Sequence, residues 1–415
     1  MTELTDLERT EAASERRLET HPDDIAALNM AALGALRRAE LGRARGLLER
    51  AALLAPGDAD SHHHLARVLE ADGDFSGALA ADEIAVRLAP DRAILRLAYA
   101  SGLDRHGEKE RALLHYARAI KEAQSAGHWT NAATTPPALR PRVEHAVTAL
   151  RRGQQALFHR LLAPLVASYG AASLDRVSAA TRIDVGEQQA VYPDPRQRPT
   201  FFYIPGLRPT AYFDRRLFSW IPAYEKCFDE IKRELQDLLP SARGSERVFG
   251  SDALEDENLR GHGTAPSWNG YYFYRHGKRR EDNCAACPAT AAALDALPLI
   301  RIRDHGPEVL FSVFTPGTHL LPHRGVTNAR VVSHLALMVP PDCALRVGGE
   351  EQVWCEGRTL VFDDTYEHEA WNLSKQVRVV LIADLWHPQL TEVERAAVAE
   401  LIAAIGDLQT AVDEL

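Results

Sequence analysis

The feature of this sequence that most constrains its fold is a spacing of 34 residues that recurs near the start of the 415-residue chain. Pro22, Pro56 and Pro90 keep this spacing. Three sets of alanines keep it in other phases: Ala32, Ala66 and Ala100; Ala44, Ala78 and Ala112; Ala51, Ala85 and Ala119. Four phases that share one period indicate an internal repeat, because a coincidence would have to occur independently in each phase.

A period of 34 residues is that of the tetratricopeptide repeat (TPR), in which each unit is a helix–turn–helix pair. Small residues suit positions where the two helices cross closely, and proline suits the position after the second helix, which it cannot extend. We therefore expect a repeat domain over residues 1–126, with units at 25–58, 59–92 and 93–126 after a capping helix at 3–20. Such a concave surface typically binds a peptide or partner protein. A scaffold or dimerisation role is the alternative.

The composition of the chain changes after about residue 199, from alanine, leucine and arginine to aromatic residues, valine and glycine. We expect a helical connector at 127–196, ending at a proline-containing break, and a second domain at 197–415. Six short segments read as strands: 309–314, 331–339, 344–347, 351–354, 358–362 and 377–382. Short strands with tight turns between them predict an antiparallel barrel or jelly roll. A capping box at 391–394 predicts a C-terminal helix. The fold class is therefore multidomain α plus β, an α-helical solenoid followed by a β-rich domain.

Composition excludes several classes of function. The net charge of −10 argues against nucleic acid as the main partner, because phosphate binding needs a clustered positive surface. The chain has no apolar run long enough for a membrane span and no N-terminal secretory pattern. Five cysteines in 415 residues do not make a disulfide scaffold. We therefore expect a cytoplasmic protein.

Two histidines in the second half could hold a metal ion. His323 and His368 each lie at the expected edge of a strand, where they could meet across the mouth of a small barrel. Neutral imidazoles are good ligands for Fe(II). Arg378, on the next strand, has a planar fork that suits a carboxylate, and Ser312 could add a hydroxyl to the same group. Two histidines followed by an arginine describe an oxygenase that uses iron and 2-oxoglutarate.

The segment from residue 201 to 395 resembles the aspartyl/asparaginyl β-hydroxylase family. The motifs that carry the resemblance are at 203–207, 315–319, 322–328, 362–371 and 384–388. The resemblance implies a double-stranded β-helix (jelly-roll, cupin-like) fold. It also implies a dioxygenase that depends on Fe(II), 2-oxoglutarate and O₂ and releases succinate and CO₂. Vertebrate members of the family also carry helical repeats before the catalytic domain, in agreement with the period found independently here.

The same resemblance implies that His323 and His368 hold the iron. Most oxygenases of this kind add an acidic ligand two residues after the first histidine, and here that residue is Gly325. The family is unusual in having glycine at this place. Asp364, four residues before His368, is an alternative ligand, and a supporting or loop-shaping role is the other interpretation.

The resemblance also implies the residues that bind the organic molecules. Arg378 and Ser312 would hold the distal carboxylate of 2-oxoglutarate, and His334 would lie near its other carboxylate. Arg330 would lie near the acid of the substrate, and Trp268 would line the substrate cleft. Other interpretations stay open: Ser312 as an ordinary strand residue, Trp268 as a core residue and His334 as a hydrogen-bonded histidine of the barrel.

Two positions depart from the family pattern. Val332 stands where the animal enzymes have a second arginine, which puts the substrate in doubt more than the cofactor. Cys284 and Cys287 lie where the secreted relatives form a more widely spaced disulfide, and the second cysteine of that pair is Ala291 here. An isolated pair of this spacing does not complete a zinc site, so we expect two reduced thiols.

Three functions follow from these observations. The first is hydroxylation of the β-carbon of an Asp or Asn residue in a peptide or protein that the repeats could recruit. The second is hydroxylation of a small, carrier-bound or natural-product-precursor amino acid, which Val332 motivates. The third is a non-catalytic interaction protein built on the repeats. The sequence alone does not identify the substrate or the oligomeric state.

Overall fold

The computed structural model describes residues 6–239, 244–248, 259–261 and 267–415. The chain forms two compact units, residues 1–154 with 408–415, and residues 155–407. The boundary lies within one continuous helix, α8 (Arg140–Tyr169). The predicted connector at 127–196 is therefore divided between the units, because the first half of α8 packs in the core of the repeats and the second half packs in another core.

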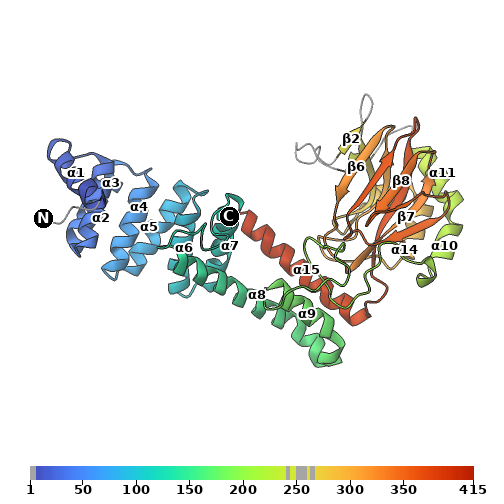
Figure 1. Ribbon diagram of the computed structural model, residues 1–415, viewed down its shortest axis with the longest axis horizontal. Helices are drawn as coiled ribbons and strands as arrows, with labels where there is room; N and C mark the ends of the chain where they lie inside the picture. The colour runs from blue at the N-terminus through green and yellow to red at the C-terminus, as the bar shows by residue number, and fades with distance from the viewer. Residues whose placement is uncertain (1–5, 240–243, 249–258, 262–266) are drawn as a thin grey trace. The chain divides into compact units, whose positions relative to one another are not determined.

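The first unit consists of paired helices that follow the predicted repeat (Figure 1). The helices are α1 (Asp6–Thr20), α2 (Ile25–Arg37), α3 (Leu41–Leu54), α4 (Ala59–Ala71), α5 (Phe75–Leu88), α6 (Ala93–Arg105) and α7 (Lys109–Ser125). The nine repeating alanines are all buried, none more than 4% exposed. Pro56 and Pro90 lie just after α3 and α5, the second helices of their pairs. The spacing therefore reports the close crossing of the helices in each pair, as predicted.

The second unit is built on two antiparallel sheets, coloured yellow to red in Figure 1. The larger sheet, in spatial order, contains β1 (Ser245–Arg247), β3 (Trp268–Arg275), β5 (Val309–Phe314), β12 (Arg378–Trp386), β7 (Arg330–Met338) and β10 (Thr359–Phe362), with β4 (Lys278–Arg279) beside β3. The smaller sheet contains β2 (Leu259–Gly261), β6 (Thr318–His323), β11 (His368–Asn372), β8 (Cys343–Val347) and β9 (Glu350–Gln352). All six predicted strands are present, and the predicted fold class is confirmed.

The two sheets face each other, because one hydrophobic cluster draws side chains from both. Val332 and Val380 of the larger sheet share this cluster with Leu345 and Ala370 of the smaller one. The other face of the larger sheet packs against helices, since a second cluster joins Phe311 and Leu381 to residues of these helices. The covering helices are α10 (Ile221–Lys226), α11 (Phe228–Leu238), α13 (Glu281–Ala286) and α14 (Pro288–Asp295).

The C-terminal helix α15 (Glu392–Asp413) begins at the predicted capping box. The backbone N–H of Thr391 donates to the carboxylate of Glu394 at 2.9 Å, and the backbone N–H of Glu394 donates to the Thr391 hydroxyl at 3.3 Å. The apolar face of α15 packs in the core that also holds α9 (Asp175–Asp184) and the second half of α8. Reciprocal capping of this kind fixes where the helix starts.

The two cysteines that depart from the family pattern are buried free thiols. Cys284 lies in α13, and Cys287 precedes α14. Burial raises the pKa of Cys287 to about 12, which keeps the thiol protonated and unreactive. Among the described residues, no helix is long and apolar enough to cross a membrane.

Candidate active site

The residues predicted to carry the chemistry line one cavity of about 280 Å³ between the two sheets. All seven contribute to its wall: Trp268, Ser312, His323, Arg330, His334, His368 and Arg378. They come from six different strands, so only the pairing of the strands brings them together. The same wall includes Val332, Asp364 and Gly325, the other positions that the sequence singled out.

The two candidate metal ligands lie on neighbouring strands of the smaller sheet. His323 is the last residue of β6 and His368 is the first residue of β11. The register of the antiparallel pair places them directly opposite each other, with ring centroids 4.1 Å apart. This register brings two residues that are distant in the sequence onto one rim of the cavity.

The hydrogen bonds of the two imidazoles fix their tautomers. Nδ1 of His323 donates to the carbonyl of Leu321 at 2.8 Å, and Nδ1 of His368 donates to the carbonyl of Tyr366 at 3.1 Å. A carbonyl can only accept, so each Nδ1 carries the proton and each Nε2 keeps its lone pair. Burial lowers the pKa of both rings, to about 4 for His368. Both rings are therefore in the neutral form that binds metal ions.

The position at which most related oxygenases have an acidic ligand has no room for a side chain. A Cβ added to Gly325 would overlap the carboxylate of Asp364. One oxygen of Asp364 forms an ion pair with Arg330. The other oxygen, Oδ1, is buried and has no hydrogen-bond partner among the described residues. An acidic residue at position 325 would place its carboxylate at this point of the cavity. Here the carboxylate of Asp364 occupies that space instead.

A buried arginine marks one end of the cavity. Arg378 is 1% exposed, and its Nη1 lies 3.4 Å from the hydroxyl of Ser312. Its guanidinium contacts two aromatic rings, 3.7 Å from the centroid of Phe314 and 4.9 Å from that of Trp354. No carboxylate in the described part of the chain forms an ion pair with it, and burial lowers its pKa to about 9. A buried cation without a counterion favours the binding of an anion.

Ser312 and His334 lie at the same end of the cavity. The indole N–H of Trp268 donates to the hydroxyl of Ser312 at 2.9 Å, so both side chains are part of one polar arrangement. His334 is buried and stacks on Trp354, with its ring centroid 5.9 Å away. Its Nδ1 has no hydrogen-bond partner within the described ranges. This histidine is therefore not a fully hydrogen-bonded barrel residue, which was one of the interpretations left open.

Arg330 lies at the opposite end, and its charge is already engaged. Its Nη1 donates to Asp384 at 2.9 Å, and its Nη2 pairs with Asp364. Burial and the two carboxylates act in opposite directions on its pKa, which is raised above its ordinary value, so it stays charged. For Arg330 to bind the carboxylate of a substrate, as predicted, that carboxylate would have to compete with Asp364 and Asp384, which already pair with it.

Two residues of the cavity wall and one residue behind it were missed by the sequence reasoning. Glu308 and Asp384 line the end that holds Arg330. Trp354 does not line the cavity but contacts Arg378 and His334, which do. A sequence signal existed for Glu308, because it precedes the predicted strand at 309–314 in the same alternating phase as Ser312. Asp384 belongs to a recognised motif, but nothing in the sequence pairs it with Arg330.

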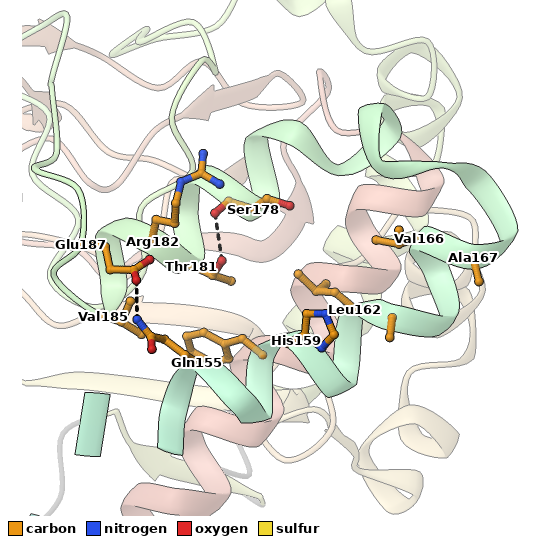
Figure 2. Close-up of a pocket in the computed structure, with 12 residues that line it drawn as sticks. Gln155, His159, Leu162, Val166, Ala167, Ser178, Thr181, Arg182, Val185 and Glu187 are labelled. Atoms are coloured by element: carbon orange, nitrogen blue, oxygen red, sulfur yellow. Dashed lines mark hydrogen bonds between the residues drawn. The ribbon is translucent and has the colours of Figure 1, made fainter. Parts of the chain in front are cut away.

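A second, larger cavity of about 510 Å³ lies between α8 and α9 (Figure 2). Its floor is apolar, with Leu162 and Val166, and its polar rim includes Gln155 and Glu187, which hydrogen-bond to each other. None of the predicted site residues lines it. The cavity between the sheets is therefore the candidate active site.

The cavity between the sheets has the character of an enzyme site, because buried polar atoms without partners line it alongside neutral metal-binding groups. Residues 225–388 match the sequence profile of the family described as aspartyl/asparaginyl beta-hydroxylase. This match lies within the C-terminal unit and confirms the resemblance identified in the sequence.

Several curated relatives share this region. The human aspartyl/asparaginyl beta-hydroxylase is 39% identical over 142 residues, which are 34% of this chain and 18% of the relative. The ornithine lipid ester-linked acyl 2-hydroxylase of Rhizobium tropici is 37% identical over 179 residues, 42% of this chain and 60% of the relative. The human aspartate beta-hydroxylase domain-containing protein 1 is 33% identical over 255 residues, 59% of this chain and 61% of the relative. This chain thus spans less than two thirds of each of these relatives.

Solved structures with helical repeats align with the chain more loosely. YrrB, described as a TPR protein with an unusual peptide-binding site, is 15% identical with a TM-score of 0.28, covering 43% of this chain and 94% of YrrB. A structure of MamA is 25% identical with a TM-score of 0.26, covering 28% of this chain and 69% of MamA.

Proposed function

We propose that this chain is an Fe(II)- and 2-oxoglutarate-dependent dioxygenase that hydroxylates an amino-acid residue of a peptide or protein and releases succinate and CO₂. The observation that carries the proposal is the pair of neutral histidines with free Nε2 atoms in a cavity whose far end holds a buried arginine without a counterion. The β-carbon of Asp or Asn is the target that the family name suggests.

The donor set fits a divalent iron ion. His323 and His368 would hold it through Nε2, because both Nδ1 atoms already donate to backbone carbonyls. Gly325 has no side chain to offer, and the carboxylate of Asp364 fills the space where one would lie. The described residues contain no group of three metal-binding side chains, so the two histidines would be the protein ligands, and Asp364 is better placed as a supporting group. When bound, iron would supply the oxidation by O₂ that inserts one oxygen atom into a C–H bond.

The basic end of the cavity fits a short dicarboxylate. The guanidinium of Arg378 can donate two parallel hydrogen bonds to one carboxylate, and the hydroxyl of Ser312 can donate a third. Trp268 orients that hydroxyl by donating to it. His334, with its unused Nδ1, is placed to meet a second polar group of the same molecule. These residues would bind and orient 2-oxoglutarate.

Aromatic side chains would keep water from the reacting atoms. Phe314 and Trp354 both contact the Arg378 guanidinium, and Phe362 packs against both His334 and His368. A dry wall strengthens the attraction between the arginine and a bound carboxylate, because the local dielectric constant is low.

Two alternatives remain distinct from this proposal. A small, carrier-bound or natural-product-precursor amino acid would use the same cavity. Val332, in the cavity wall where the animal enzymes have an arginine, favours such a different substrate. A non-catalytic interaction protein would not need the free Nε2 atoms. The helical repeats support a role in recruiting a peptide or protein, and the five free cysteines support the cytoplasmic location expected from the sequence.

The test is turnover by the purified full chain with Fe(II), 2-oxoglutarate and candidate peptides. We expect succinate that depends on added iron, together with a one-oxygen mass increase on the peptide. The absence of succinate under all conditions, together with no binding of Mn(II) as an iron surrogate, would rule out the enzyme and favour the interaction protein.

A further inference from the structure

The wall of the active-site cavity is polarised along its length. Glu308 directly precedes β5, in the same alternating phase as Ser312, and both line the cavity. Four residues of extended chain span about 13 Å. On β12, Arg378 and Asp384 also line it from opposite ends of the strand. Since β5 and β12 are antiparallel, Ser312 lies beside Arg378 and Glu308 lies beside Asp384. One end of the cavity is basic and the other is acidic.

The acidic end contains three carboxylates and one guanidinium among the described residues of the cavity wall: Glu308, Asp364, Asp384 and Arg330. The two ion pairs of Arg330 use both of its terminal nitrogens. Glu308 forms no ion pair with Arg330. The ring of the exposed His276 lies 3.1 Å from it, but burial lowers the pKa of His276 and favours its neutral form. The side chain of Glu308 is 27% exposed, so an incoming group can reach it. Asp364 is 5% exposed, and its Oδ1 still has no partner. The negative charge at this end therefore exceeds the positive charge.

No other cation of the described wall balances this surplus. Val332, which faces the cavity opposite Asp384 in the β7–β12 pair, replaces the second arginine that the family resemblance places here. Arg324 also lines the cavity, but it donates to the carbonyl of Arg196 at 2.6 Å and pairs with Glu367. Arg378 belongs to the other end. A substrate carboxylate would meet repulsion from Glu308. The arginine at this end, Arg330, already pairs with two carboxylates and keeps only its Nε–H without a partner among the described residues.

We propose that the acidic end binds a positively charged group of the substrate, and that Glu308 is the residue that determines this specificity. The substrate class is a residue with a basic side chain, lysine-like or arginine-like, in place of the acidic residue that the family name suggests. This inference rests on the proposed function, because it assigns the substrate end of the same cavity.

The chemistry of Glu308 agrees with this assignment. Burial, aided by the charge of Asp384, raises the pKa of Glu308 to about 7. In the empty site Glu308 is therefore partly protonated near neutral pH, which reduces the unfavourable free energy of a buried charge. An ammonium or guanidinium beside Glu308 favours its ionised form, and the resulting charge-assisted hydrogen bond is stronger than a neutral one. Asp364 Oδ1 offers a second acceptor in the same cavity.

The experiment compares two blocked tripeptides, acetyl-Gly-Arg-Gly-amide and acetyl-Gly-Asp-Gly-amide, with the full chain loaded with Mn(II) and 2-oxoglutarate. Calorimetry measures the affinity of each peptide for the wild type and for Glu308→Gln, which removes the charge and keeps the shape. Glu281→Gln is the matched control, because Glu281 is 73% exposed, pairs with Arg279 and does not line the cavity. Succinate release with Fe(II) is measured in parallel.

We expect the arginine peptide to bind at least tenfold more tightly than the aspartate peptide, and Glu308→Gln to remove most of that preference while Glu281→Gln keeps it. Val332→Arg should shift the preference toward the aspartate peptide. Equal or tighter binding of the aspartate peptide, binding of neither peptide, or an unchanged preference in Glu308→Gln would overturn the inference. Absence of both succinate and 2-oxoglutarate binding would instead overturn the proposed function.

Discussion

His323 and His368 face each other across the antiparallel pair formed by β6 and β11, with their ring centroids 4.1 Å apart and both Nδ1 protons held by backbone carbonyls. Backbone carbonyls thus orient both Nε2 atoms. A site organised in this way depends on the two imidazoles and on the register of the strands, and it can be tested by removing one ring at a time.

Replacing either ring should weaken metal binding. We expect His323→Ala and His368→Ala each to lower the affinity for Mn(II) at least tenfold, because one of two imidazole ligands is lost. His319→Ala is the control, since His319 also lies on β6 but pairs with Glu369 and does not line the cavity. The metal-dependent rise in melting temperature measures the effect. A loss of affinity in the control equal to that in the variants would point to damage to β6 itself.

Arg378 should stabilise a bound dicarboxylate while destabilising the empty protein. We expect Arg378→Met to raise the stability of the unliganded chain by about 1–3 kcal/mol, because it removes a buried charge that has no counterion. The same change should abolish the rise in melting temperature caused by 2-oxoglutarate. Arg346→Met, at a side chain that is 42% exposed and paired with Glu369, should change neither quantity. A less stable Arg378→Met chain that still responds to 2-oxoglutarate would contradict the assigned role.

The sequence predicted the helices better than the site, and the reason is physical. The repeat is visible because each alanine is buried by a neighbour on the adjacent helix, so local spacing records the packing. The strands that end and begin at His323 and His368 were not predicted, since β6 contains Pro322 and β11 mixes polar and aromatic residues. The sequence could place Glu308 in the same strand phase as Ser312, but its position beside Asp384 depends on the pairing of β5 with β12, and such long-range register leaves no local signal.

The contact between Gly325 and Asp364 predicts that the glycine cannot be replaced alone. Gly325→Ala should destabilise the chain by about 1–3 kcal/mol, because its Cβ would overlap the carboxylate of Asp364. The double variant Gly325→Ala, Asp364→Gly should relieve that overlap. Denaturant unfolding of the two single variants and the double variant measures the coupling. Additive effects would mean that the two positions do not compete for space.

The raised pKa of Glu308 predicts how the binding of a basic substrate depends on pH. Since the pKa of Glu308 is raised to about 7, its neutral form dominates below that pH and its carboxylate dominates above it. The affinity for acetyl-Gly-Arg-Gly-amide should therefore rise as the pH increases from 6 to 8, by up to about tenfold, the gain expected from a charge-assisted hydrogen bond.

Other charged and titratable groups around Glu308 also influence how binding depends on pH. His276 donates its backbone N–H to the carboxylate, and Asp384, Arg275 and Arg330 act on it through their charges. His276, whose pKa is lowered, loses any remaining positive charge as the pH rises. Calorimetry of wild type and Glu308→Gln at pH 6, 7 and 8 separates these effects, because only titration of Glu308 disappears in the variant. A pH dependence that persists in Glu308→Gln would assign the titration to another group, and a flat profile in the wild type would show that Glu308 does not meet the cation.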